Sequence, residues 1–355
     1  MSADRRSPEK TASQVSANTP LRYRRVVVKA GTSVLTSDSE PRGLNTTVVA
    51  DLVRQICKLK DLGAEVLLVT SGAIAAGRQA LHKAGPNPGR EQPERDITSR
   101  QVLAAVGQSR LMHTYQQLFD SMGFQVAQAL LTINDLSDRQ SYLNLGNTLT
   151  GLLELGVIPI LNENDVVAVD EIGEVFGDND RLSALVANLV DADVLVILTD
   201  TDGLYTGDPN HDSSATLVPL VNEVNETIEH LAGKELNPWA RGGMTTKLEA
   251  ARLVTSSGMT MVMCRGTAQD AVLKAARGEP IGTLFRPAEE KLEARKRWML
   301  GAISHKGMVK IDAGASRAVR ESNRSLLPAG IQGVEGEFRR GDIIFIVNPD
   351  GQRIA

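Results

Sequence analysis

The chain has 355 residues, 42% of them hydrophobic, which is enough for one large folded domain and a smaller second one. A formal net charge of -4 and an aromatic content of 3% argue against a general nucleic-acid-binding protein, which needs basic surface and stacking side chains. No apolar run approaches the roughly 18 residues of a membrane span, and the first residues lack the apolar core of a signal peptide, so we expect a cytoplasmic protein.

The N-terminal region joins a polar tail to the first strand. Residues 1–24 are rich in serine, threonine and charge, and we expect them to form a disordered tail. Residues 26–28 predict a short buried strand that runs into Lys29 and Gly31. Because glycine lets the backbone present N–H groups to an anion and lysine adds a cation, this junction is typical of a phosphate cradle. The Walker A spacing is missing, so an ordinary surface loop remains an alternative.

A second strand-to-turn junction follows one helix later. The pattern predicts a helix over residues 46–62 and a strand over residues 66–69. Residues 70–73, which include Ser71, then turn the chain into another helix. Two such turns after parallel strands lie at one edge of a sheet, and their coincidence favours a ligand site more than either turn alone.

The next segment alternates helices, a strand and loops. The expected elements are an exposed loop over 84–96, a helix over 99–122, a strand over 126–131, a polar loop over 132–139 and a helix over 142–155. The two cysteines fit this kind of fold as buried small side chains. Cys57 lies in a helical pattern and Cys264 ends an apolar strand, which favours that interpretation over a disulfide or a metal pair.

Polar side chains gather where two further strands end. Residues 157–161 run into a polar string that closes with Asp165, and residues 194–198 run into Thr199 and Asp200. Ligand sites in open α/β sheets form at the carboxyl ends of parallel strands. These residues therefore indicate a binding edge.

The helix between those two strands begins at the same edge. Residues 182–189 carry apolar side chains at helical spacing, and Asn179 or Asp180 stands where the N-cap belongs. Asparagine and aspartate are preferred N-caps and turn formers, so a purely structural role stays open for both. Further along, residues 241–247 combine two glycines with a lysine before a helix over 248–256.

Alternating strands and helices predict the fold class, an α/β domain with a doubly wound, mostly parallel sheet covered by helices on both faces. We expect this domain to span residues 25–287, followed by a charged linker over 288–297. Residues 298–355 predict a small, apparently incomplete all-β domain. Its expected strands are 307–311, 330–334 and 343–347.

The predicted edge carries the groups that phosphoryl transfer needs. Lys29 and Lys247 supply cations, Asp165, Asp180 and Asp200 supply carboxylates, and glycine turns supply backbone donors. These parts fit a nucleotide-dependent kinase. All five histidines fall outside the strand-end strings, which favours an anionic acceptor that needs no base over a hydroxyl, although a hydroxyl acceptor stays open.

Six motifs, in this order, resemble the amino acid kinase family. They are residues 28–33 (VKAGTS), 70–73 (TSGA), 162–165 (NEND), 177–180 (GDND), 199–205 (TDTDGLY) and 242–247 (GGMTTK). The likeness extends over residues 25–355, because residues 298–355 resemble the PUA domain appended to many of these kinases. That appendage points to the branch of the family that phosphorylates the side chain of L-glutamate, the step that opens proline biosynthesis.

The resemblance implies a role for each matching residue. Lys29 and Lys247 would hold the transferring phosphoryl group, and Asp180 would orient both. The positions that match glutamate binding are Ser71, Asp165 and Asn179. The positions that match ATP binding are Lys29, Gly31, Thr199, Asp200, Arg241, Gly242, Gly243, Met244, Thr245, Thr246 and Lys247.

Ligands and partners also follow from the resemblance. It implies ATP with Mg²⁺ as cofactors, glutamyl 5-phosphate as product, proline as a feedback inhibitor and a homo-oligomer, a dimer or tetramer. Arg241 stands where the family often has a small residue. PUA domains elsewhere accompany RNA-modifying enzymes, but the C-terminal region is only mildly basic and poor in aromatics, so we expect no nucleic-acid partner.

Overall fold

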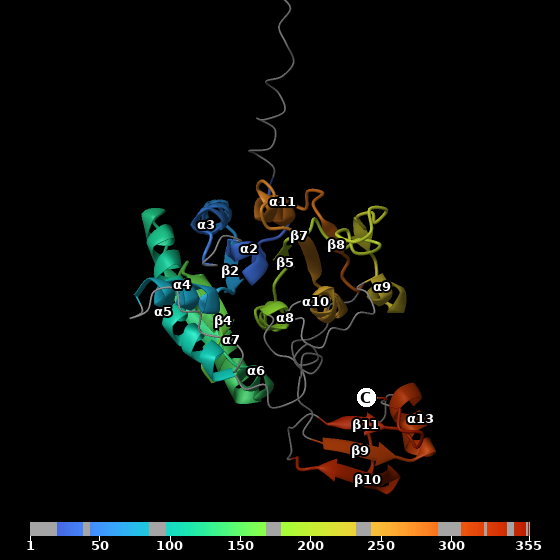
Figure 1. The fold of residues 1–355 in the computed structure, drawn as a ribbon. Helices are drawn as coiled ribbons and strands as arrows, with labels where there is room; N and C mark the ends of the chain where they lie inside the picture. The colour runs from blue at the N-terminus through green and yellow to red at the C-terminus, as the bar shows by residue number, and fades with distance from the viewer. Residues whose placement is uncertain are drawn as a thin grey trace, which may run out of the picture.

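The computed structural model describes residues 20–37, 43–84, 97–167, 179–231, 243–289, 307–322, 325–338, 344–352 and 354. Its main feature is an eight-stranded sheet with the strand order β3-β4-β2-β1-β5-β7-β8-β6 (Figure 1). The strands are β1 (Arg25–Ala30), β2 (Glu65–Thr70), β3 (Val126–Leu131), β4 (Ile158–Glu163), β5 (Val194–Thr199), β6 (Leu220–Val221), β7 (Thr260–Arg265) and β8 (Thr283–Phe285). All neighbouring pairs are parallel except β7 and β8, which confirms the predicted mostly parallel sheet.

The central strands are buried on both faces because their sequences are nearly continuous apolar runs. Every residue of β4 and β5 is buried, and β1 is buried after its first residue. Alternate side chains of β1 point into different cores, Val26 and Val28 into one and Val27 into the other. The sheet thus separates two hydrophobic cores, one on each face.

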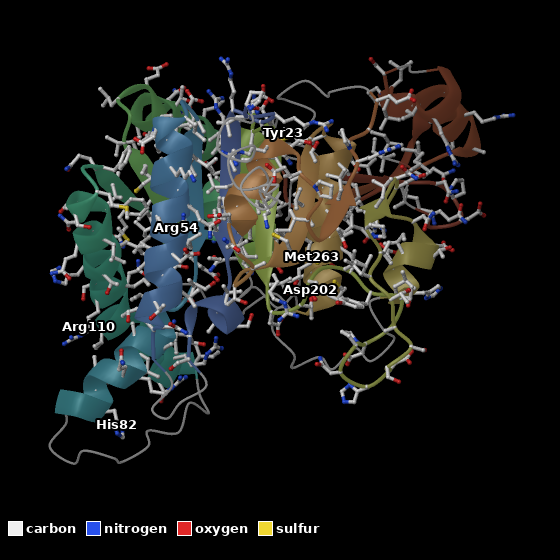
Figure 2. The ribbon with its side chains drawn as sticks, turned by 90° about the horizontal axis from the view of Figure 1, so that it is seen from above. Tyr23, Arg54, His82, Arg110, Asp202 and Met263 are labelled. Atoms are coloured by element: carbon white, nitrogen blue, oxygen red, sulfur yellow. The ribbon has the colours of Figure 1, made fainter. Side chains whose placement is uncertain are left out.

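Helices cover both faces, as the alternating pattern predicts. The helices of this domain are α2 (Thr32–Leu35), α3 (Thr46–Asp61), α4 (Ala73–Ala84), α5 (Ile97–Ser121), α6 (Ile133–Ser137), α7 (Arg139–Glu154), α8 (Asn179–Leu189), α9 (Glu226–Leu231), α10 (Met244–Ser256) and α11 (Ala271–Arg277). Figure 1 shows α3 and α11 on one side of the central strands and α8 and α10 on the other. Arg54 of α3, labelled in Figure 2, joins α11 through an ion pair with Asp270 at 2.8 Å.

Three helix boundaries differ from the expectations, and each difference bears on the site. The predicted polar loop over 132–139 contains α6, since Thr132 and Asp135 form a capping box that starts a helix. Asn179 and Asp180 are not N-caps, because both lie inside the first turn of α8. Helix α10 begins at Met244, so Lys247 lies in its first turn rather than in a preceding loop.

Two glycines let α4 and α5 pack with their backbones in contact. A Cβ atom at Gly77 would collide with the carbonyl of Leu103, and one at Gly107 with the carbonyl of Ala73. Any larger side chain would push the helices apart. This close packing fixes α5 against the turn that precedes α4.

The C-terminal region forms a separate three-stranded sheet in the order β10-β9-β11. Strand β9 (Gly307–Ile311) pairs antiparallel with β10 (Ile331–Gly336) and parallel with β11 (Phe345–Val347). The three predicted strands are present and form the expected small sheet, and helix α13 (Ala313–Ser322) and a short 3-10 turn at Pro328–Gly330 connect β9 to β10. Within the described parts of the chain, no helix is long and apolar enough to cross a membrane.

Candidate active site

Two lysines and one aspartate meet at the carboxyl edge of the large sheet. Lys29 comes from β1, Asp180 from the first turn of α8 and Lys247 from the first turn of α10. The two carboxylate oxygens of Asp180 lie 2.5 Å from Lys29 Nζ and 3.1 Å from Lys247 Nζ. The three predicted catalytic residues therefore form one cluster, although they are far apart in the sequence.

The cluster is buried and brings two cationic side chains to one carboxylate. The Asp180 side chain is fully buried, and those of Lys29 and Lys247 are 4% and 10% exposed. Burying a charge is costly unless it is paired, and both ammonium groups contact Asp180. Two ammonium groups held this close together suit a phosphoryl group, which gathers negative charge as it is transferred.

The start of α10 adds further donors beside the cluster. Thr246 Oγ1 lies 3.1 Å from Asp180 Oδ2 and donates to the Gly243 carbonyl at 2.9 Å. Gly243 is the N-cap of this 13-residue helix, and its side-chain position faces open space. Backbone N–H groups at such a helix start, next to two lysines, can bind phosphate oxygens.

Gly31 lies directly beside the Lys29 ammonium group. A Cβ atom at this position would lie 3.0 Å from Lys29 Nζ, so a larger residue would require the lysine to shift. The glycine of the first predicted turn thus leaves room beside the lysine and does not serve a left-handed backbone, since its φ is -80°.

Hydrogen bonds between carboxamides extend from this cluster into the neighbouring strands. Asn179 Nδ2 lies within hydrogen-bond distance of the Thr70 carbonyl (2.9 Å), Ser71 Oγ (2.8 Å) and Asn162 Oδ1 (3.0 Å). Asn162 Nδ2 in turn donates to Gln108 Oε1 of α5 at 2.8 Å. Of the three predicted substrate-binding residues, the structure therefore brings Ser71 and Asn179 into direct contact.

Asp165, the third predicted substrate-binding residue, lies just after β4 and lines a cavity of about 320 Å³. The cavity lies between α5, β3 and the end of β4, and it is lined by Ala104, Ala105, Gln108, Ser109, Gln128, Leu130, Glu163, Asn164, Asp165 and Val166. Burial raises the pKa of the Asp165 carboxyl, and the charge of Arg100 opposes that rise. A desolvated carboxylate of this kind gains from an ammonium group brought by a ligand.

Gln108 was missed by the sequence reasoning. It lies within the apolar stripe of α5, one helical turn from both Ala104 and Leu111, where a polar side chain is unusual. Tyr115, further along the same helix, was also missed, and its buried hydroxyl lies 2.8 Å from Thr70 Oγ1 beside the Ser71 turn. Burial raises the pKa of Tyr115, so it remains a neutral hydrogen-bonding group.

The predicted nucleotide residues are only partly described. Thr199 is buried at the end of β5 and donates from Oγ1 to Asp200 Oδ1 at 3.0 Å, while Asp200 is exposed. Arg241 and Gly242 lie outside the described residues. Thr245 and Thr246 follow Met244 in the first turn of α10.

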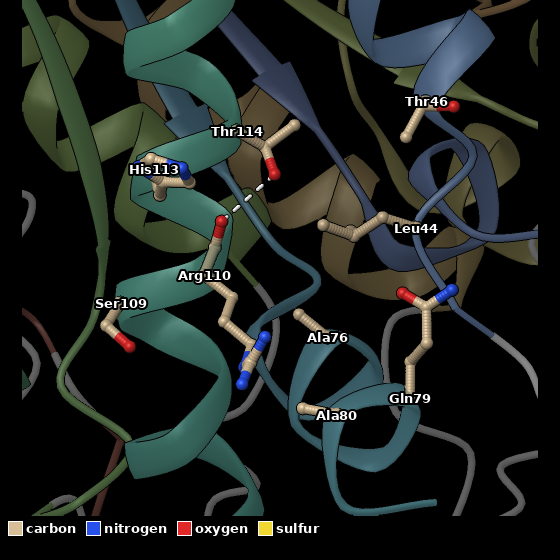
Figure 3. Close-up of a pocket in the computed structure, with 9 residues that line it drawn as sticks. All are labelled: Leu44, Thr46, Ala76, Gln79, Ala80, Ser109, Arg110, His113 and Thr114. Carbon is tan, nitrogen blue, oxygen red and sulfur yellow. Dashed lines mark hydrogen bonds between the residues drawn. The ribbon is translucent and has the colours of Figure 1, made fainter. Parts of the chain in front are cut away.

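A larger cavity of about 440 Å³ lies between the start of α3, α4 and α5 (Figure 3). Thr114 Oγ1 donates to the Arg110 carbonyl across one wall, at 3.0 Å. The lining residues are Leu44, Thr46, Ala76, Gln79, Ala80, Ser109, Arg110, His113 and Thr114. None of these was predicted as a site residue.

A magnesium site made by protein groups alone is not seen in the described residues. These residues contain no group of three or more histidine, cysteine, aspartate or glutamate side chains placed to hold a metal ion. Mg²⁺ in kinases is commonly held by substrate phosphates with one or two carboxylates and waters. The donor set beside the lysine cluster fits that kind of binding, with Asp200 as a nearby exposed carboxylate.

Comparisons with known proteins agree with the geometry. Residues 24–265 match the amino acid kinase family and residues 307–355 match the PUA domain. A glutamate 5-kinase of Dehalococcoides mccartyi (strain CBDB1) is 50% identical over 334 residues, which is 94% of this chain and 87% of the relative. A glutamate 5-kinase of Herpetosiphon aurantiacus is 50% identical over 333 residues, with the same two shares.

A solved structure shows the same fold at lower similarity. The UMP kinase of Bacillus anthracis superimposes with a TM-score of 0.51 at 18% identity, covering 74% of this chain and 96% of the kinase. The match to the family covers most of the chain. This chain belongs to the amino acid kinase family and carries a PUA domain at its C-terminal end.

Proposed function

We propose that this protein is a glutamate 5-kinase, which transfers the γ-phosphoryl group of ATP to the side-chain carboxylate of L-glutamate. A carboxylate oxygen attacks the γ-phosphorus, the bond between that phosphorus and the bridging oxygen breaks, and ADP leaves with the electron pair. The products are L-glutamyl 5-phosphate and ADP, and the reaction is the first step of proline biosynthesis. The 50% identity to glutamate 5-kinases over nearly the whole chain supports this substrate.

The observation that carries the proposal is the buried contact of Lys29 and Lys247 with Asp180. In this proposal the two ammonium groups neutralise charge on the oxygens of the transferring phosphoryl group, and Asp180 fixes where they point. A carboxylate acceptor, with an ordinary pKa near ~4, is already ionised at neutral pH and needs no general base. That agrees with the absence of histidine from the strand-end motifs.

Binding of the two substrates is assigned to the two sides of this cluster. Ser71, Asn179 and Asp165 would bind glutamate, and Thr199, Asp200 and the start of α10 would bind ATP. Mg²⁺ bound with the nucleotide would supply additional charge neutralisation at the phosphates. Asn179, which directly precedes Asp180 in the sequence, contacts Ser71, and this contact supports the division.

The proposal is tested by measuring ADP release with Mg-ATP and glutamate, aspartate, N-acetylglutamate or no acceptor, with hydroxylamine present to trap an acyl phosphate. Glutamate-dependent ADP with a trapped hydroxamate is the expected result. ADP release that follows another acceptor would assign a different member of the family, and no release by a folded sample would overturn the kinase assignment.

Loss of one lysine gives a sharper test of the chemistry. Lys247→Met removes one charge-stabilising group, and by analogy with lost oxyanion donors it is expected to lower kcat by about 100-fold, roughly 3 kcal/mol. The matched control is Lys58→Met, an exposed lysine of α3, which should retain normal turnover. Near-normal kcat in the Lys247 variant would exclude its catalytic role.

The same proposal includes regulation, assembly and location. Proline is expected to inhibit the enzyme, and the chain is expected to form a dimer or tetramer in the cytoplasm, with a kinase domain over residues 25–287 and a PUA-like domain over 298–355. Turnover measured against proline concentration and light scattering of the purified protein test these two points. Unchanged activity in excess proline would contradict the first, and a monomer at micromolar concentration would contradict the second.

A further inference from the structure

The side-chain amide of Gln108 is only half satisfied. Its Oε1 accepts the hydrogen bond from Asn162 at 2.8 Å. Its Nε2 is buried and has no hydrogen-bond partner among the residues that the structure describes. A buried donor without a partner costs about 1–3 kcal/mol, so each such group in a folded protein calls for an explanation.

A ligand in the adjoining cavity supplies that explanation. Gln108 and Asp165 both line the 320 Å³ cavity, and Gln108 also carries the unused amide donor. An α-amino acid carries the two complementary groups, a carboxylate and an ammonium, on a single carbon atom. A cavity lined by one residue with a spare donor and another with a carboxylate therefore suits that head group.

The hydrogen bonds give the bound molecule a direction. They lead from Gln108 through Asn162 to Asn179, which directly precedes Asp180 in the lysine cluster. The reacting side-chain carboxylate of a substrate must lie at the Asp180 end, where the phosphoryl group is transferred. Its head group then extends toward Gln108 and Asp165.

We propose that Gln108 determines specificity, donating a hydrogen bond from Nε2 to the α-carboxylate of the amino-acid substrate while Asp165 receives the substrate ammonium group. This inference rests on the proposed function, because it names a group that recognises glutamate. It also gives Gln108 a second task, which is to hold Asn162 through Oε1. In this proposal Nε2 binds the substrate, while Oε1 holds Asn162.

Helix α5 holds Gln108 in place for this role. The neighbouring Gly107 lies in direct backbone contact with α4, and Tyr115, two turns further on, is bonded to Thr70. A recognition group on a fixed helix loses little freedom on binding and therefore discriminates well between ligands.

The test compares glutamate with 4-aminobutyrate, which keeps the ammonium group and the reacting carboxylate but lacks the α-carboxylate. In the purified full chain, Gln108→Leu should lower kcat/KM for glutamate by about 10- to 100-fold, mainly through KM, because a hydrogen bond to a charged group is lost. The value for 4-aminobutyrate should fall by a clearly smaller factor, because that ligand does not use the Nε2 donor and loses only the support that Oε1 gives to Asn162. If its turnover is too slow, its Ki against glutamate provides the same comparison.

Gln108→Glu separates recognition from positioning. The side chain introduced by this substitution keeps an oxygen acceptor for Asn162 but replaces the Nε2 donor with a negative charge. The kcat/KM for the substrate, glutamate, should therefore fall at least as far as in the leucine variant. Gln79→Leu, on α4 in the other cavity, is the matched control and should behave as wild type. If kcat/KM fell equally for glutamate and 4-aminobutyrate in the Gln108 variants, or if the ratio of the two values stayed as in wild type, the inference would be overturned and Gln108 would be a structural residue. A wild-type protein without glutamate-dependent ADP release would instead overturn the proposed function, and the inference with it.

Discussion

Two carboxylates at the same sheet edge, a fully buried one and a half-buried one, have opposite surroundings. Asp180 lies between two ammonium groups at 2.5 and 3.1 Å, so its charge is balanced within the protein. Asp165 lies beside a cavity, where burial raises its pKa and only the charge of Arg100 opposes that effect. The first carboxylate is complete without a ligand, whereas the second gains its strongest partner only when a cation enters the cavity.

This difference assigns separate tasks to the two ends of the site. The Asp180 end is organised before any substrate arrives, as transition-state stabilisation requires, because reorganising charged groups during the reaction would cost free energy. In the proposed function, the Asp165 end responds to the substrate and therefore controls binding. Changes at the first end should act on kcat, and changes at the second end should act on KM.

The largest effect is expected from Asp180→Asn. This change removes the carboxylate that both buried ammonium groups contact, which should lower kcat by about 1000-fold and reduce the free energy of unfolding by about 3–5 kcal/mol. Steady-state kinetics and thermal denaturation measure the two effects. The control is Asp51→Asn, whose partner Arg54 is 41% exposed and whose loss should cost less than about 1 kcal/mol. Normal turnover in the Asp180 variant would remove the distinction between the two ends.

A pH-dependent effect is expected at Asp165. Because its pKa is raised, Asp165 becomes protonated, as pH falls, earlier than an ordinary carboxyl with a pKa near ~4. Protonation removes the charge that attracts the substrate ammonium group, so KM for glutamate should rise as pH falls through that raised pKa. Asp165→Asn should increase KM at neutral pH by roughly 10-fold, leave kcat within a few-fold and abolish this pH dependence. An unchanged pH profile in the variant would show that another group controls binding.

The smallest effect is expected from Thr246→Val, which keeps the side-chain shape. It removes the hydroxyl that lies 3.1 Å from Asp180, and a typical hydrogen bond of about 1 kcal/mol corresponds to a roughly fivefold lower kcat. Thr246→Ser keeps the hydroxyl and should be close to wild type. If the valine variant showed only a higher KM for glutamate and an unchanged kcat, Thr246 would act in substrate binding and not at the Asp180 end of the site.

Local patterns in the sequence were sufficient to predict most of the strands and the sheet edge at which the candidate site residues lie. Apolar runs such as residues 194–198 indicate buried strands, because a short segment that is apolar at every position is typical of a parallel strand covered on both faces. Polar residues directly after such strands have to lie at one edge of a parallel sheet. The candidates Lys29, Asp165, Asp180 and Lys247 could therefore be placed at this edge without coordinates, and the resemblance to the family added an expected role for each.

Only the tertiary structure decided which of these groups touch. The single carboxylate of Asp180 contacts lysines from β1 and α10, 151 positions before it and 67 after it, and no local pattern encodes such a pair of distances. Gln108 was overlooked for the same reason, since its place in the site depends on a hydrogen bond to Asn162, a residue 54 positions away. Periodicity reports which face of an element is buried, whereas a binding site is made by the packing of several elements against one another, and that packing is fixed by the two cores of the folded sheet.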